Sequence, residues 1–131
     1  FLLGLRRNRP AQGTWFVPGG VLRKDERFDE AFVRIAEAEL GLRSHLDDAQ
    51  FLGPYQHFYP DNFAGLPGFG THYVVLAWLL PLTQRPQALP DAQHRGYRWV
   101  SIDGLARDES IHCNSRVYAT HRLLQVSNDD G

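Results

Sequence analysis

One carboxylate stands out in the helix that the sequence predicts over Arg27–Leu40, because its neighbours on the same face are apolar. At about 100° per residue, Phe28, Phe32, Ile35 and Glu39 fall on one stripe. An unpaired carboxylate is costly to bury, and the last turn of a helix disfavours negative charge. A divalent cation would remove both penalties. So would an arginine partner or an exposed helix end, and the helix alone favours neither explanation.

The residues around this helix favour the cation. Pro18–Gly20 precedes the helix and can turn sharply and expose its carbonyls. Carbonyl and carboxylate oxygens are the ligands that magnesium prefers. Arg34 lies on a flank of the helix, where pairing with Glu30 or Glu37 would explain it without a function.

Strands, one helix, further strands and a final helix are the elements that must position these groups. The pattern predicts an α/β (α+β) fold with a mostly antiparallel sheet covered by helices. Asp25 is the expected N-cap of the first helix and Gly41 its stop. The loop Pro60–Gly70 is long enough to have a function, and closing over a substrate or forming a dimer interface remain open. The expected strands are Phe1–Arg6, Trp15–Pro18, Gln50–Tyr59, His72–Leu82 and Tyr97–Ser101, and the final helix is Ser115–Val126.

Composition excludes several classes of protein. The 131 residues favour a single domain, 1–131, and we expect a further segment upstream of Phe1. A net charge of −1 gives no global field for nucleic acid or for an anionic membrane. The apolar stretch Tyr73–Leu82 is too short to span a bilayer. Cys113 is the only cysteine, which suits a reducing, cytoplasmic setting.

The stretch Gly20–Leu42 resembles the Nudix box. The box glycines, glutamates and arginine match Gly20, Glu26, Arg34, Glu39 and Gly41, while Ile35 and Ala38 replace two family glutamates. The resemblance implies the Nudix fold. The two replacements leave one box carboxylate at the end of the helix, where most members bind several metal ions and cut a pyrophosphate at phosphorus.

Further segments resemble one subgroup, the GDP-mannose mannosyl hydrolases, from Phe1 to about Tyr118. They include NRPAQGTWFVPGG, QHFYPDNF, THYVVLAW, DAQH and HCNSR. The subgroup is a homodimer that uses Mg²⁺, with Mn²⁺ as an alternative, and substitutes at the anomeric carbon with inversion. The resemblance therefore implies a cytoplasmic, magnesium-dependent hydrolase that converts GDP-mannose or GDP-glucose to GDP and free sugar.

The resemblance assigns roles to individual residues. Its metal ligands match the Gly19 carbonyl, the Glu39 carboxylate and the Gln93 side chain, and its general base matches His94. Its diphosphate-binding and catalytic arginines match Arg6 and Arg34, while a third arginine is replaced by Val21. Two further substrate-binding positions match Tyr73 and His57, although ordinary structural roles would explain either residue.

Two other functions remain open. An ordinary Nudix pyrophosphohydrolase would release GMP and a sugar phosphate, which the two missing glutamates disfavour. A non-catalytic module would only hold a nucleotide sugar, and it would not need a histidine base beside a metal ligand.

Overall fold

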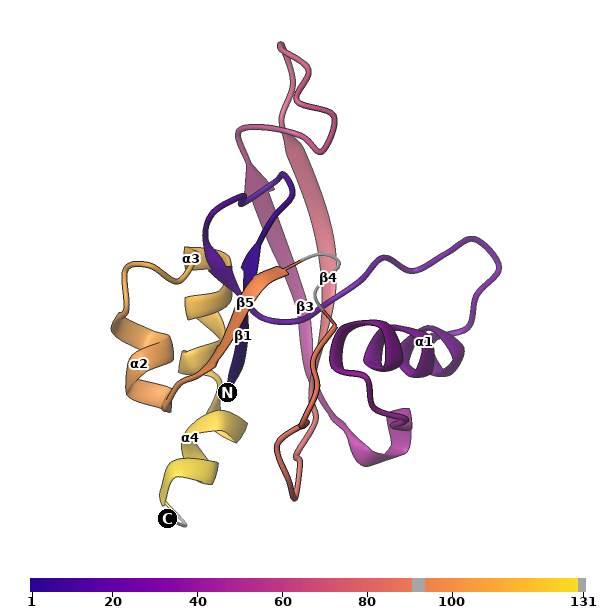
Figure 1. The fold of residues 1–131 in the computed structure, drawn as a ribbon, viewed down its shortest axis with the longest axis vertical. Helices are drawn as coiled ribbons and strands as arrows, with labels where there is room; N and C mark the ends of the chain where they lie inside the picture. Colours follow the sequence, from indigo (N-terminus) through magenta and orange to yellow (C-terminus); the bar gives the residue numbers. More distant parts are fainter. Residues whose placement is uncertain (91–93, 130–131) are drawn as a thin grey trace.

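The computed structural model describes residues 1–90 and 94–129, and its strands form two antiparallel sheets. In the first sheet, β1 (Leu2–Arg6) lies between β2 (Trp15–Phe16) and β5 (His94–Trp99). The second is a long hairpin of β3 (Gln50–Tyr59) and β4 (Thr71–Leu79). Helix α1 (Phe28–Leu40) lies on one side of the strands. On the other side lie α2 (Ile102–Arg107), α3 (Cys113–Arg116) and α4 (Arg122–Asp129) (Figure 1).

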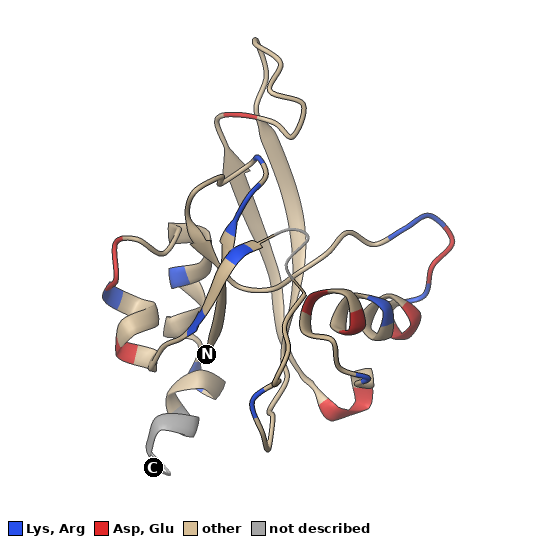
Figure 2. Ribbon diagram, viewed as in Figure 1, with Lys and Arg blue, Asp and Glu red and all other residues tan. Residues whose placement is uncertain are grey.

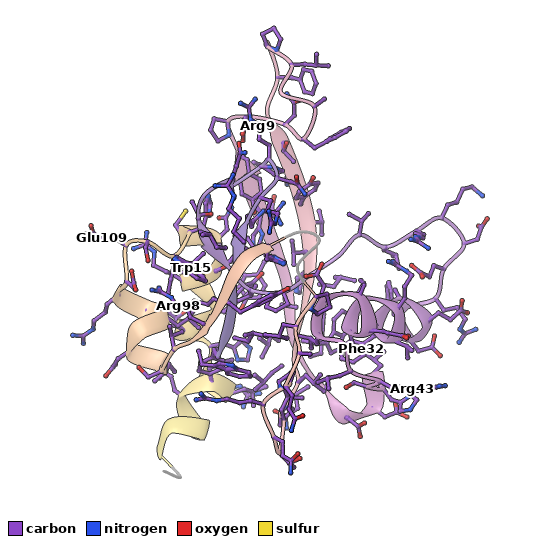
Figure 3. All side chains as sticks on the ribbon, viewed as in Figure 1. Arg9, Trp15, Phe32, Arg43, Arg98 and Glu109 are labelled. Carbon is purple, nitrogen blue, oxygen red and sulfur yellow. The ribbon has the colours of Figure 1, made fainter. Side chains whose placement is uncertain are left out.

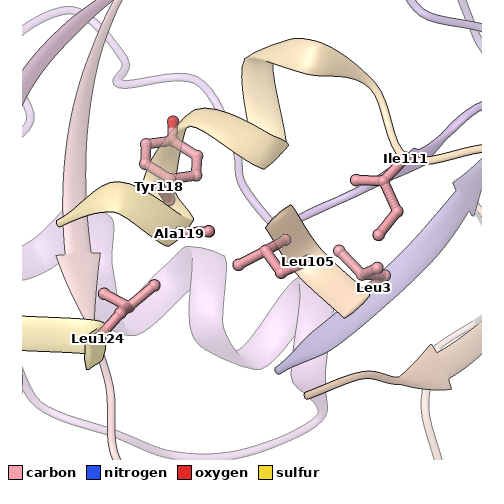
Figure 4. Packing of buried hydrophobic residues seen from close by; sticks show 6 residues of the cluster. All are labelled: Leu3, Leu105, Ile111, Tyr118, Ala119 and Leu124. Atoms are coloured by element: carbon pink, nitrogen blue, oxygen red, sulfur yellow. The ribbon is translucent and has the colours of Figure 1, made fainter. Parts of the chain in front are cut away.

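The hydrophobic core fills the space between β1 and the C-terminal helices. Its buried members are Leu3, Leu105, Ile111, Tyr118, Ala119 and Leu124 (Figure 4). Because side chains alternate along a strand, Leu3 points into this core while Gly4 points the other way. The core thus anchors β1 from one side and leaves its opposite face for the site.

The predicted fold class and helix α1 are confirmed, with changes at the element ends. Gly41 ends α1 in the left-handed conformation, and its N–H bonds the carbonyl of Glu37. The Asp25 N-cap prediction is wrong. The cap position is Arg27, and Asp25 has a φ of 64° in a turn where Glu26 accepts a hydrogen bond from the N–H of Arg23.

Two other boundaries differ because tertiary contacts override local propensity. The helix predicted over Ser115–Val126 is divided into α3, a 3₁₀ turn (η2, Val117–Thr120) and α4. The division falls at His121, whose ring bonds both the carbonyl of Leu52 and the N–H of Leu123. The strand predicted over Tyr97–Ser101 starts earlier, at His94.

Several short elements also differ from the prediction. The strand predicted over Trp15–Pro18 is only Trp15–Phe16, and the strand predicted over His72–Leu82 is Thr71–Leu79. Helix α2 was not predicted, although Ser101 caps it by accepting from the N–H of Gly104. A 3₁₀ turn, η1 (Leu46–Asp48), was also not predicted. None of the helices in residues 1–90 and 94–129 has the length and apolarity needed to cross a bilayer.

Charge is unevenly distributed over these elements. Acidic and basic residues alternate along α1 and the loop before it, whereas β3 and β4 carry none (Figure 2). The hairpin therefore offers aromatic and amide groups, and formal charge near it must come from neighbouring elements.

Candidate active site

Glu39 is the buried carboxylate that the helical pattern singled out. Only 5% of it is exposed, although it lies in the last turn of α1. Its Oε2 atom has no hydrogen-bond partner among residues 1–90 and 94–129. Burial raises the pKa of Glu39 to about 7, and the positive charge of Arg6 only partly opposes that rise. The sequence left two alternatives to a cation at Glu39, an exposed helix end and an arginine partner. The first is wrong, because Glu39 is buried, and no arginine among the described residues forms a hydrogen bond with Oε2.

His94 lies next to this carboxylate, at the start of β5 and opposite Arg6 of β1. Its Nδ1 is 3.7 Å from Oε2 of Glu39 and 3.3 Å from the hydroxyl of Tyr97. Burial lowers the pKa of His94, and Arg6 and Arg7 lower it further. The imidazole is therefore neutral at physiological pH, as a general base must be before it takes a proton.

Gly4 makes room for the His94 ring. A Cβ atom at Gly4 would overlap the ring carbons of His94. The close approach of strand backbone and imidazole therefore requires glycine at this position, for steric reasons alone.

Arg6 provides the positive charge at the centre of the site. Its Nε donates to the carbonyl of Pro10 at 2.9 Å, and its guanidinium lies over the Phe16 ring, 5.9 Å from the centroid. Within the described part of the chain, its two terminal nitrogens have no hydrogen bond, so they can bind an anion. Its charge lowers the pKa values of Glu39, His94, Tyr59 and His112, which places it among these four groups.

Arg34 has a different partner from the two that the sequence suggested. Its Nε donates to Glu26 Oε2 at 2.7 Å, and its Nη2 donates to Glu26 Oε1 at 2.9 Å and to the Val21 carbonyl at 2.6 Å. This pairing lowers the pKa of Glu26 to about 2. One terminal nitrogen, Nη1, remains for a substrate, and the paired carboxylate fixes the plane of the guanidinium.

The groups proposed to bind a metal are only partly described. Gly20 packs against the Ile35 side chain, one turn before Glu39, so the glycine turn runs along the same stretch of α1. Gly19 is exposed. Gln93 lies outside the described residues. No cluster of three or more His, Cys, Asp or Glu side chains suited to a metal exists in residues 1–90 and 94–129. A hard cation still fits Oε2 of Glu39, because it would compensate an acceptor that none of the described residues satisfies.

His57 and Tyr73 face each other in the β3–β4 register but differ in exposure. His57 is buried, and its Nε2 lies 3.1 Å from the Tyr118 hydroxyl. Tyr73 is 40% exposed, and its ring centroid lies 6.0 Å from that of Tyr59. Tyr73 is therefore accessible to a substrate, whereas His57 is packed among Phe16, Tyr59 and Tyr118.

His112 is a site residue that the sequence reasoning missed. Its Nδ1 accepts from the backbone N–H of Asn114 at 3.0 Å. The neutral ring, favoured by burial, must therefore carry its proton on Nε2. It packs against Phe16 and Tyr59. The motif HCNSR contained it, but no helical or strand pattern indicated that the loop before α3 would reach the Arg6 region.

Comparison with known proteins identifies the family. The NUDIX domain model matches residues 1–120, which is most of the chain. The chain belongs to the NUDIX family.

Individual relatives agree with this assignment. This NUDIX domain is 37% identical over 94 residues to the low-salt glycan biosynthesis protein Agl8 of Haloferax volcanii; the match covers 71% of this chain and 57% of Agl8. The chain thus spans just over half of that relative. The MutT NUDIX hydrolase of Burkholderia pseudomallei superposes with a TM-score of 0.68 at 25% identity, covering 92% of this chain and 86% of that one. The NUDIX domain of Shewanella oneidensis NrtR, solved with ADP ribose, shares the fold at 19% identity and a TM-score of 0.62, covering 98% and 75%.

The residues of the Nudix box have defined contacts in the fold. Glu26 and Arg34 form its ion pair, Gly20 packs on the helix, and Glu39 is the buried carboxylate. Ile35, in place of a family glutamate, fills the contact with Gly20, so an apolar packing contact replaces a charge.

Proposed function

We propose that this Nudix hydrolase cleaves GDP-mannose or GDP-glucose to GDP and free sugar in the presence of Mg²⁺. The observation that carries the proposal is the juxtaposition of Glu39 and His94. A carboxylate oxygen with no hydrogen-bond partner in the described part of the chain lies 3.7 Å from a neutral buried imidazole. One carboxylate beside one base suits attack on the sugar. Attack at phosphorus by most family members uses the two glutamates that are missing here.

The proposed step moves one proton and exchanges one bond. A water molecule attacks the anomeric carbon while His94 accepts a water proton. The bond between that carbon and the diphosphate oxygen breaks on the opposite face, which inverts the configuration, and GDP departs with the bonding electrons. Arg6 and the free nitrogen of Arg34 hold the diphosphate oxygens, because guanidinium groups suit phosphate geometry.

The residues proposed to hold Mg²⁺ are Glu39, the Gly19 carbonyl and Gln93. When bound, the ion supplies a Lewis acid that neutralises charge on the leaving diphosphate. The name of the Haloferax volcanii relative, which refers to glycan biosynthesis, agrees with a nucleotide-sugar substrate. The subgroup resemblance further implies a cytoplasmic location and a homodimer. Light scattering of the purified protein tests the dimer directly.

Turnover in ¹⁸O-labelled water tests the reaction. We expect the label in the sugar and none in the nucleotide. Label in GMP or in a sugar phosphate would instead assign attack at phosphorus. Binding of the nucleotide sugar without turnover would assign a non-catalytic module.

A further inference from the structure

The loop that joins β3 and β4 forms one wall of an open cavity of about 510 Å³ at the tip of the hairpin. This volume is in the range of small-molecule sites. The cavity is lined by Pro60, Asp61, Leu66 and Phe69 from the loop and by Arg9 from the connection between β1 and β2. It thus combines apolar and ring surfaces with one acid and one base.

The loop is held in a defined shape by the buried side chain of Asn62. Its amide nitrogen donates to the carbonyls of Leu66 and Phe69 at 2.8 and 3.0 Å, and its oxygen accepts from the N–H of Leu66 at 3.1 Å. The Thr71 hydroxyl bonds the backbone carbonyl of Asp61 at 2.7 Å. These bonds use no carboxylate, so the Asp61 side chain is not required for the shape of the loop.

The two charged groups of the cavity are Asp61 and Arg9. In the part of the chain that the structure describes, neither the half-buried Asp61 carboxylate nor the Arg9 guanidinium forms a hydrogen bond or ion pair. The Arg9 guanidinium lies against the backbone at Gly65, where a Cβ atom would be only 2.6 Å from its Nη1. The cavity therefore offers one group that only accepts hydrogen bonds and one that only donates them.

We propose that this cavity binds the guanine base of the nucleotide, an inference that rests on the proposed function. Guanine carries adjacent N1–H and N2–H₂ donors that a carboxylate accepts, and its O6 and N7 atoms accept from a guanidinium. Adenine presents an N1 acceptor and an N6 donor instead, so it would oppose like groups at both ends. Asp61 and Arg9 are thus the residues that select the base.

The position of the cavity agrees with this role. Arg9 is three residues from Arg6, whose Nε bonds the carbonyl of Pro10. On the other side, Pro60 directly follows Tyr59, whose pKa reflects the charge of Arg6. A diphosphate held by Arg6 would therefore have its nucleoside end next to the cavity.

The test measures equilibrium binding of GDP, ADP and xanthosine diphosphate with Mg²⁺ by calorimetry. We expect the wild type to prefer GDP over ADP, and Asp61→Asn to weaken GDP binding about 10- to 100-fold, the effect of losing hydrogen bonds to a charged group. Asp61→Asn should prefer xanthosine diphosphate over GDP, because the asparagine amide donates to the O2 of xanthine and still accepts from N1–H. Arg9→Gln should weaken GDP binding more than ADP binding.

Two exposed residues outside the cavity give matched controls. Asp47 lies on η1, and Arg43 lies far from Arg9 in the molecule (Figure 3). Asp47→Asn and Arg43→Gln should therefore leave the base preference unchanged. The inference is overturned if the wild type does not prefer GDP, or if Asp61→Asn keeps the wild-type preference. Labelled-water turnover separates the two proposals. If the label enters the sugar but Asp61→Asn keeps the wild-type base preference, only the base site is refuted. If the label enters a phosphate product but Asp61→Asn switches its base preference, only the sugar chemistry is refuted.

Discussion

Oε2 of Glu39 lies 3.7 Å from Nδ1 of His94, and no hydrogen bond joins these two buried side chains. Burial raises the pKa of the carboxyl group to about 7 and lowers the pKa of the imidazole. Without a metal ion, the pair is thus most stable as a neutral acid beside a neutral base. A bound cation reverses the preference of Glu39 for its proton, which links metal binding to pH.

In the metal-free protein, the contribution of Glu39 to the free energy of unfolding should be lost as the pH rises. Because the folded pKa of about 7 is above the ordinary value of 4.5, this contribution is complete below pH 4.5 and is lost through pH 7, about 3 kcal/mol in all. The lowered histidine pKa values act in the opposite direction, so the difference between wild type and Glu39→Gln isolates the effect. Urea unfolding with chelator at pH 5 and pH 8 measures it, and an equal difference at both values would contradict the raised pKa.

Mg²⁺ should stabilise the wild type and not Glu39→Gln. At pH 8 and one hundred times its dissociation constant, a ligand that binds only the folded state adds about 2.7 kcal/mol. Thermal unfolding with and without Mg²⁺ shows the change, and Mn²⁺ titration gives the number of sites. Glu37→Gln, an exposed carboxylate on the same helix, is the matched control and should respond like the wild type.

His94 should set the acid limb of the activity profile. Its lowered pKa predicts that kcat/KM declines only below pH 6.5, where the imidazole becomes protonated. His94→Gln should reduce kcat about 10²- to 10⁴-fold with little change in the Kd for GDP. Arg7→Gln removes a charge that lowers this pKa, so its acid limb should move to higher pH, and less so at high salt. Arg43→Gln should leave the profile in place.

Gly4→Ala should impair catalysis through His94. The added methyl group would occupy the space of the imidazole ring, so kcat should fall by at least about tenfold as the base is displaced. Gly96→Ala is the matched control on the neighbouring strand, since its Cβ would meet only Trp15 at 3.9 Å. Steady-state kinetics and the chemical shifts of the His94 ring report the effect. Normal kcat with an unshifted ring would disprove the steric argument.

Arg34→Lys should weaken nucleotide binding, because lysine keeps the charge but cannot bond both oxygens of Glu26 and also reach a phosphate. We expect KM to rise about tenfold, by analogy with the loss of one hydrogen bond between charged groups. Arg27→Lys, an exposed arginine at the start of α1, serves as the control. An unchanged KM would confine Arg34 to its structural pairing with Glu26.

Local sequence patterns were enough to predict helix α1 and the position of its unusual carboxylate. Local patterns were sufficient there, because the apolar stripe has the helical period and Gly41 can adopt the left-handed conformation that ends a helix. The aromatic-rich composition of Gln50–Tyr59 also predicted β3 correctly, because aromatic residues favour strands. The resemblance of the box residues indicated the family for the same reason, since the spacing is local.

Which side chains meet depends on contacts between distant parts of the chain. The contact of His94 with Glu39 depends on the pairing of β1 with β5, which joins residues almost ninety positions apart, and on the missing side chain at Gly4. Helical spacing predicted the wrong partner for Arg34, because its actual partner, Glu26, lies in the turn before the helix. Connections between helices and strands carry His112, Asp61 and Arg9, and such segments have no repeating hydrophobic pattern from which their contacts could be predicted. Strand pairing and loop closure bring them together, and these are properties of the whole chain.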